Sequence, residues 1–354
     1  MHRADRPAAA GLGDQRILRS HRPPLFVHIF EHCDSSKETR RSVYAVSRQD
    51  LRTTAVGRRT CQDCTRGKRA AFVKVLLISC GDVGTEAGFR FQARGAHVTA
   101  WRRNPQKLPP TFHGQQVDVA SGQLPPIDPD TEVALFTPVP ASRDAAGYEH
   151  SYLQAARHLV TALQQQAPAL RRLFYISSTA VNAGNDGQWV TEQHPKEPRR
   201  ETAKVLACTE DYLLDSALPV TILRASGIYG PGRTRLIDSL REGKARLPRS
   251  SQWTNRVHRD DLAKAVVHLA HFGSDIDELY LATDNEPAQL AEVYEHLAGL
   301  LGTTPPPASE EAPGSGADRR LSNARLRATG WEPTFPNYRE GYRAILRGSG
   351  RRHH

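Results

Sequence analysis

The chain has 354 residues, five cysteines and a formal net charge of +10, and 38% of its residues are hydrophobic. This length is enough for one large domain with a smaller lobe, or for two domains. No apolar run reaches the roughly 18 residues of a transmembrane helix, and no compact apolar segment near the start indicates a signal peptide. The few, irregularly spaced cysteines exclude a disulfide framework and favour a reducing cytoplasm.

The positive charge is concentrated in the first 72 residues, which hold 15 Lys or Arg and 7 Asp or Glu, whereas residues 73–354 have a net charge of only +2. Segment 1–72 is rich in arginine and poorly periodic, so we expect it to be mostly disordered. Three alternatives stay open: a nucleic-acid-binding arm, a start codon assigned too early, and a zinc site formed from His28, His32, Cys33, Cys61 and Cys64. A single C-x-x-C pair and a basic composition are weak signals, so we expect no metal and no nucleic acid.

The pattern strand, glycine turn, helix, strand is predicted over residues 73–103. An apolar run over 73–78 is typical of a strand buried on both faces, the helix is expected over 85–94, and a second strand over 97–101. The turn between them offers small residues and helix N–H groups to a pyrophosphate, although serine stands where the first glycine of G-x-G-x-x-G is expected. The candidate cofactor-binding residues of this turn are Ser79, Gly81, Asp82, Val83 and Gly84.

The residues after the second strand indicate which dinucleotide is bound. An NAD site usually has Asp or Glu there, which accepts hydrogen bonds from the ribose hydroxyls. This chain has Arg102 and Arg103 instead. Because a guanidinium favours a phosphate, we expect NADP as the cofactor and NAD as the less favoured one.

Strands and helices alternate through the rest of the chain. Such alternation predicts an α/β fold with a doubly wound parallel sheet, of the Rossmann type. A linker rich in Pro, Gly, Ser and Glu is expected over 303–318. The strands are expected over 115–119, 132–137, 172–178, 219–224 and 278–283, and the helices over 145–166, 201–216, 260–272, 287–301, 321–328 and 338–346.

Four sequence blocks resemble the extended short-chain dehydrogenase/reductase superfamily, in its NAD-dependent epimerase/dehydratase branch, and most closely the atypical YeeZ-like members. They are ISCGDVG at 78–84, YISSTAV at 175–181, LRASGIYGPGR at 223–233 and NRVHRDDLAKAV at 255–266. The resemblance covers about residues 73–347 and implies a Rossmann domain with a small, mainly C-terminal substrate lobe, formed chiefly by 226–258 and 284–347. Residues 348–354 would be a tail.

The resemblance implies a catalytic set of Ser or Thr, Tyr and a Lys four residues after the Tyr. Ser178 matches the first position and Lys204 could be the lysine, which would also bind the nicotinamide ribose. Four residues before Lys204, however, stands Arg200, which cannot act as an acid near neutral pH. Tyr229 is a substitute candidate. The further cofactor-binding positions that the resemblance implies are Asp118, Val119, Thr137, Pro138 and Ser177.

Each of these residues also has a structural interpretation. Tyr229 and a second titratable candidate, His258, are expected more often as packing residues, and Cys80 as a buried small residue. Lys204 is expected equally as a ribose-binding residue and as a solvated helix lysine. The leading functional interpretation is an NADP-binding oxidoreductase or epimerase/dehydratase-like enzyme with a small polar or sugar-like substrate. A cofactor-binding sensor that has lost the catalytic tyrosine is the main alternative. The resemblance also suggests a homodimer.

Overall fold

The computed structural model describes residues 73–273, 275–309 and 318–353. All of them belong to one unit, Gly67–His354. The expectations for residues 1–72, namely disorder, the zinc site and the nucleic-acid arm, fall outside the described residues.

A seven-stranded parallel sheet forms the centre of this unit, with the strand order β12-β7-β5-β4-β1-β2-β3. The order reverses direction between β1 and β4, and in such sheets ligands bind at the carboxyl ends of the strands near that point. The predicted doubly wound parallel fold is therefore confirmed. The strands are β1 (Lys74–Ile78), β2 (His97–Arg102), β3 (His113–Gln116), β4 (Thr131–Phe136), β5 (Arg172–Ser178), β7 (Val220–Ala225) and β12 (Leu279–Ala282).

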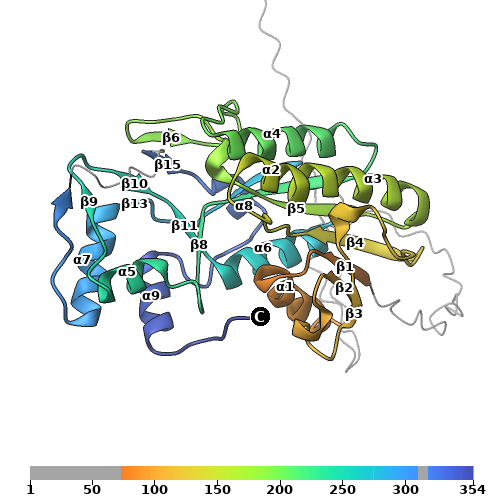
Figure 1. Cartoon of the computed structure of the whole chain (residues 1–354), viewed down its shortest axis with the longest axis horizontal. Coiled ribbons are helices and arrows are strands. Elements are labelled where there is room, and N and C mark those ends of the chain that lie inside the picture. Colours follow the sequence, from red (N-terminus) through yellow and green to blue (C-terminus); the bar gives the residue numbers. More distant parts are fainter. Residues whose placement is uncertain (1–72, 274, 310–317, 354) are drawn as a thin grey trace, which may run out of the picture. The chain divides into compact units, whose positions relative to one another are not determined.

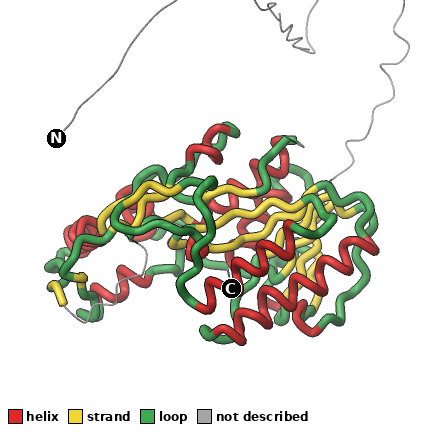
Figure 2. Tube along the Cα trace, turned by 90° about the horizontal axis from the view of Figure 1, so that it is seen from above, coloured by secondary structure: helices red, strands yellow, loops and turns green. Residues whose placement is uncertain are grey.

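Helices cover both faces of the sheet (Figure 1, Figure 2). Helices α1 (Asp82–Gln92) and α6 (Arg259–Phe272) pack together on one face, and α2 (Ala145–Tyr148), α3 (Ala155–Gln166) and α4 (Glu201–Leu214) lie on the other. Two apolar clusters fill the two layers, one containing Leu77 and Phe91, the other Ile78 and Leu159. Because both faces are buried, strand β1 has an apolar run instead of an alternating pattern.

A smaller lobe with its own apolar cluster is formed by the later part of the chain (left in Figure 1). Its helices are α5 (Arg235–Arg241), α7 (Leu290–Leu301) and α9 (Tyr338–Leu346). Around it lie short pairs of strands, and α8 (Ala324–Ala328) packs against β12. The short strands are β6 (Gln188–Val190), β8 (Gly227–Tyr229), β9 (Leu247–Pro248), β10 (Trp253–Thr254), β11 (Arg256–His258), β13 (Ala288–Gln289), β14 (Ala308–Ser309) and β15 (Arg319–Leu321).

The structure differs from the predicted elements in a few places. The strand predicted over 115–119 is β3, which begins at His113 and is a mostly exposed edge strand, so apolar residues do not mark its bounds. The helix predicted over 145–166 contains a π-helical segment, Glu149–Gln154. The short strands of the lobe were not predicted, because two- and three-residue pairings leave no periodic signal. In the part of the chain that the structure describes, no helix is both long and apolar enough to cross a membrane.

Candidate functional site

The turn between β1 and α1 has the backbone that close approach to a phosphate requires. Ser79 adopts a left-handed conformation, with φ of +55°, at the position where glycine was expected. Among the described residues, the nearest atom to a Cβ added at Gly81 would be the Ser79 carbonyl oxygen, at 3.9 Å, so this position is open. A Cβ atom at Gly84 would lie 3.1 Å from the Thr137 hydroxyl oxygen and 3.3 Å from the Cys80 sulfur. Gly81 thus leaves room above the turn, while Gly84 allows close packing of the helix below it.

Helix α1 begins directly after this turn and offers unpaired N–H groups. The N–H of Thr85 donates to the Gly81 carbonyl at 2.8 Å, so the N–H groups of Asp82 and Val83 precede the first intrahelical bond. These groups and the positive end of the helix dipole favour an anion at this position. The predicted turn residues therefore form a surface that fits the pyrophosphate of a dinucleotide.

The end of β4 lies beside the turn. The hydroxyl group of Thr137 donates to the Ser79 carbonyl oxygen at 3.2 Å, and its N–H donates to the Ile78 carbonyl oxygen at 3.1 Å. Pro138 is buried, whereas the next residue, Val139, is 61% exposed. An exposed valine at this edge was not among the predicted site residues and is an apolar surface next to the turn.

The end of β2 also reaches the turn, because the N–H of Cys80 donates to the Trp101 carbonyl oxygen at 2.8 Å. The next residues are Arg102, half-buried, and Arg103, exposed. Burial and the neighbouring Arg103 lower the pKa of Arg102, while Cys80 opposes this effect. Burial raises the pKa of the Cys80 thiol to about 11, so the thiol is neutral and serves as a small packing residue.

The predicted adenosine-side residues follow β3. Asp118 is exposed and its carboxylate accepts the N–H of Ala120, which caps the short helix Val119–Ser121. Val119 is buried, and its carbonyl oxygen contacts the His158 ring at 3.2 Å. Both residues are held in place by local contacts, and their role towards a cofactor stays a prediction.

The predicted catalytic positions on β5 and α4 each make a local contact within their own segment. The hydroxyl oxygen of Ser178 accepts the Ala180 N–H at 3.2 Å, which leaves its own proton available to a ligand. The ammonium group of Lys204 is exposed and binds Glu201 at 2.7 Å, one turn earlier on α4. Arg200 is the exposed N-cap residue of the same helix. Glu210 is the titratable residue among the buried side chains of α4.

Ser177 has a structural partner rather than an open position. Its hydroxyl donates to the Glu210 carboxylate at 2.6 Å, and Arg224 donates to the same carboxylate through Nε and Nη2, with a shortest distance of 2.7 Å. The side chains of Glu210 and Arg224 are 1% and 4% exposed. This buried ion pair joins α4 to β7 directly under the carboxyl end of β5.

Tyr229 and His258 pack inside the smaller lobe. The Tyr229 ring contacts the rings of Tyr342 and His258, and its hydroxyl lies against Gly341 in α9. Burial raises the pKa of Tyr229 and lowers the pKa of His258, so both groups stay neutral near pH 7. His258 also caps α6, because its Nδ1 accepts the Asp260 N–H. The packing interpretation of both residues fits these contacts better than an acid–base role.

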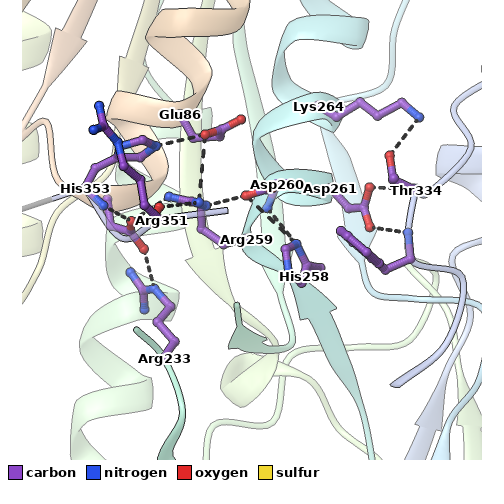
Figure 3. A network of polar contacts seen from close by, with 12 residues as sticks. Glu86, Arg233, His258, Arg259, Asp260, Asp261, Lys264, Thr334, Arg351 and His353 are labelled. Carbon is purple, nitrogen blue, oxygen red and sulfur yellow. Dashed lines mark hydrogen bonds and ion pairs between the residues drawn. The ribbon is translucent and has the colours of Figure 1, made fainter. Parts of the chain in front are cut away.

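A network of charged residues surrounds the first turn of α1 (Figure 3). The Asp82 carboxylate is bound by Arg259 at 2.7 Å, by Arg233 at 2.7 Å and by the N–H of His353 at 3.0 Å. Asp82 was predicted as a phosphate-turn residue, but its three partners were not. No sequence signal could pair residues that are 151, 177 and 271 positions apart.

Comparisons with known proteins point to a dinucleotide-binding family. Residues 79–271 match a family model described as NAD(P)H-binding. A structure from Methylobacillus flagellatus, described as an NAD-dependent epimerase/dehydratase, is 33% identical, covers 78% of this chain and 99% of its own, and has a TM-score of 0.64. The chain is also similar to the 3-diazoavenalumate denitrifying reductase of a Streptomyces species, with 28% identity over 301 residues, 74% of this chain and 96% of that protein.

A more distant likeness concerns the fold alone. The UDP-glucose 4-epimerase of Thermus thermophilus, in complex with NAD, is 20% identical and covers 78% of this chain and all of its own, with a TM-score of 0.64. The matched family model, the turn at Ser79–Gly84 and the parallel sheet lead to the same conclusion. The chain belongs to the NAD(P)H-binding family and has the Rossmann fold of extended short-chain dehydrogenases/reductases of the epimerase/dehydratase type.

Proposed function

We propose that the protein is an NADPH-dependent reductase, an atypical YeeZ-like member of its family, which transfers hydride without a tyrosine–lysine pair. The observation that carries this proposal is the orientation of α4. Lys204 binds Glu201 in solvent, and Arg200 stands where a tyrosine would be needed. The phosphate turn, in contrast, keeps the open Gly81 position and the N–H groups of Asp82 and Val83, which precede the first intrahelical bond of α1.

The bound cofactor supplies the hydride, which leaves from the nicotinamide ring. The chain's own residues bind and orient the cofactor. Gly81 and the N–H groups of Asp82 and Val83 would hold the pyrophosphate, and Arg102 and Arg103 the 2′-phosphate. Asp118, Val119, Thr137 and Pro138 would line the adenosine side.

Of the catalytic residues that the resemblance implies, Ser178 is the one that could contact the substrate. It lies at the carboxyl end of β5, where the sheet opens, and its proton is not used by its contact with Ala180. One hydroxyl can orient a substrate, but it is a poor acid near neutral pH. A general acid contributes about 10²–10⁴ to the rate of reactions that need a proton in the transition state. Carbonyl reduction is therefore disfavoured, and a substrate that needs hydride alone is favoured.

An aromatic diazonium group meets this requirement. Hydride and the aryl diazonium cation give the arene and dinitrogen: the C–N bond breaks, a C–H bond forms, and the nicotinamide is oxidised by two electrons. The charges of hydride and cation cancel, so no side chain has to donate a proton. The name of the Streptomyces relative, a denitrifying reductase of a diazo compound, supports this class of substrate. We therefore propose a small polar aromatic diazonium compound as the substrate.

The test compares two classes of acceptor. Purified protein is mixed with NADPH and either an aryl diazonium carboxylate or a panel of aldehydes, ketones and nucleotide sugars. We expect NADPH oxidation with equal release of dinitrogen in the first case, above the rate without enzyme, and no turnover in the second. A Gly81→Val variant, which should not bind the cofactor, serves as the negative control. Turnover of carbonyls, or cofactor binding without turnover of any acceptor, would contradict the proposal, and the second outcome would favour the sensor.

Cofactor preference has its own test. An Arg102→Ala variant should bind NADPH roughly 10-fold to 100-fold more weakly, because a charge-assisted hydrogen bond to the 2′-phosphate is lost. NADH binding, measured by nicotinamide fluorescence, should change by no more than about twofold. An equal loss for both cofactors would show that Arg102 does not bind the 2′-phosphate.

A further inference from the structure

The segment after α9 returns to the first turn of α1 (Figure 1, Figure 3). The N–H of His353 donates to Asp82 at 3.0 Å, and its Nε2 contacts Glu86 at 2.9 Å. The His353 ring also packs against Phe89, with centroids 5.4 Å apart. We call residues Gly350–His353 the return segment. It is held at the helix end that would face the cofactor phosphates.

The buried Arg259 links the return segment to α1. Arg259, whose side chain is 1% exposed, binds Asp82 through Nη1 at 2.7 Å and donates through Nη2 to the Arg351 carbonyl oxygen at 3.0 Å. Arg352 donates to the Gly232 carbonyl oxygen at 3.0 Å, so the segment also contacts the loop after β8. Since a buried guanidinium needs its partners, this placement is specific.

The two carboxylates near the segment, Asp82 and Glu86, already have partners for their negative charge. Hydrogen bonding from His353 lowers the pKa of Glu86 to about 2, against the opposing effect of burial. Burial would raise the pKa of Asp82, but its bonds from Arg233 and the His353 N–H outweigh that effect and lower it. Both groups are thus ionised near pH 7 and are bound to cations or N–H groups. Neither carboxylate is bound by the guanidinium group of Arg351 or Arg352, and Arg352 uses one of its five N–H donors for the Gly232 carbonyl oxygen, which leaves the others for a ligand.

A pocket of about 740 Å³ lies between α1, the loop after β2 and the return segment. Its apolar surface includes Phe89, Leu108 and Pro109, and its cationic surface includes Lys107, Arg351 and Arg352. None of the described Asp or Glu residues lines it, and its size is in the range of small-molecule sites. The loop residues that line it start at Gln106, three residues after Arg103, the second arginine of the predicted 2′-phosphate site.

We propose that Arg351 and Arg352 of the return segment, together with Lys107, bind the 2′-phosphate end of NADPH in this pocket. The proposal rests on the proposed use of NADPH. A phosphate monoester carries nearly two negative charges near pH 7, and several cations on adjacent apolar walls bind it more strongly than one exposed arginine does. The return segment thereby adds to a site that β2 alone supplies only in part.

The experiment measures equilibrium binding of NADPH, NADH, 2′,5′-ADP and 5′-AMP by calorimetry to the full chain and its variants. In the double variant Arg351→Ala/Arg352→Ala, we expect NADPH and 2′,5′-ADP to bind roughly 10-fold to 100-fold more weakly. NADH and 5′-AMP should change by no more than about twofold. The control is Arg343→Ala/Arg347→Ala, which removes two arginines of α9 and its end, outside the pocket lining. The conservative variant Arg351→Lys/Arg352→Lys should retain most of the affinity.

The outcomes separate this inference from the proposed function. If the unchanged protein shows no preference for NADPH, the proposed cofactor is wrong. If it prefers NADPH and the double variant keeps that preference, the return segment does not bind the 2′-phosphate. An equal loss for NADPH and NADH, with 2′,5′-ADP unaffected, would assign the arginines to the pyrophosphate and overturn the inference. Tighter binding by the double variant would show that the segment obstructs the site, and would overturn it as well.

Discussion

The phosphate turn and the α4 helix lie on the same Rossmann domain, but they keep different parts of the family's machinery. At the turn, Ser79 takes the backbone conformation of the glycine it replaces, and Gly81 stays open. On α4, Lys204 faces solvent and Arg200 caps the helix. The turn thus keeps the backbone geometry that a pyrophosphate needs, whereas α4 has an arginine at the position of the implied tyrosine. The comparison indicates that the backbone of the cofactor turn and the side chains used for acid–base catalysis can change independently in this fold.

The largest effect should come from the turn itself. In a Gly81→Val variant the new side chain would fill the open space above the turn, where the nearest described atom is the Ser79 carbonyl oxygen, 3.9 Å away. We expect more than about 100-fold weaker binding of both NADPH and NADH, since a pyrophosphate could no longer approach the backbone. Fluorescence titration measures this, and the melting temperature should stay near that of the unchanged protein. Retained binding would mean that the cofactor lies elsewhere.

The next largest effect concerns the stability of the fold and not the binding of the cofactor. Replacing Glu210 by Ala would leave Arg224 buried without its counter-ion. Breaking a buried pair in this way typically destabilises by about 3–5 kcal/mol, and chemical denaturation should show a loss of this size. Replacing both residues by apolar side chains of similar volume should recover most of it. A small loss in the single variant would show that water reaches Arg224.

Asp284 provides a pH-dependent test within the smaller lobe. Burial raises the pKa of its carboxyl group to about 8 from an ordinary value of 3.8, although Arg256 opposes the shift. Between these values the folded protein holds a proton that the unfolded chain has released, so this group reduces stability as pH rises from about 4 to 8. An Asp284→Asn variant should therefore be more stable than the unchanged protein by on the order of a few kcal/mol at pH 8, but not at pH 4.

The control for this test is the same comparison at low pH. Thermal melting of both proteins at about pH 4 and about pH 8 would give the difference in stability between them at each pH. If the variant gains no stability at the higher pH relative to the lower one, Asp284 is already ionised in the folded protein.

The smallest expected effect is that of replacing Lys204, and it tests the difference between α4 and the phosphate turn most directly. A Lys204→Met variant should keep its rate of NADPH oxidation and its cofactor affinity within about twofold, because the ammonium group is exposed and bound to Glu201. In a relative with the tyrosine–lysine pair, the same change would remove a catalytic group. A loss of about 100-fold or more in the rate would mean that α4 rearranges when substrate binds and that Lys204 is catalytic. Ser178→Ala, measured alongside, tests the remaining polar group.

Much of the fold was predictable, because it depends on local patterns. The strand 172–178 and the helix 338–346 have the predicted bounds, and most other long elements agree to within a few residues. The edge strand β3 and the short strands of the lobe were missed or displaced, because their pairing depends on partners that are distant in sequence. The π-helical segment 149–154 likewise has no periodic signature.

The candidate site was predictable only where it is local. The glycine turn and the arginines after β2 follow from the order of residues along about 30 positions, so the sequence by itself determined a dinucleotide-binding Rossmann domain. The direction of Lys204, the buried pair of Glu210 and Arg224, and the packing of Tyr229 against α9 required the tertiary structure.

The tertiary structure also decided what surrounds the turn. Asp82 binds Arg233, Arg259 and the return segment, which come from distant parts of the chain. Helix and strand patterns reflect interactions between near neighbours, whereas ion pairs between loops depend on how whole layers pack. The sequence therefore determined the dinucleotide-binding fold and its glycine turn, and only the folded protein decided which distant charges stand beside that turn.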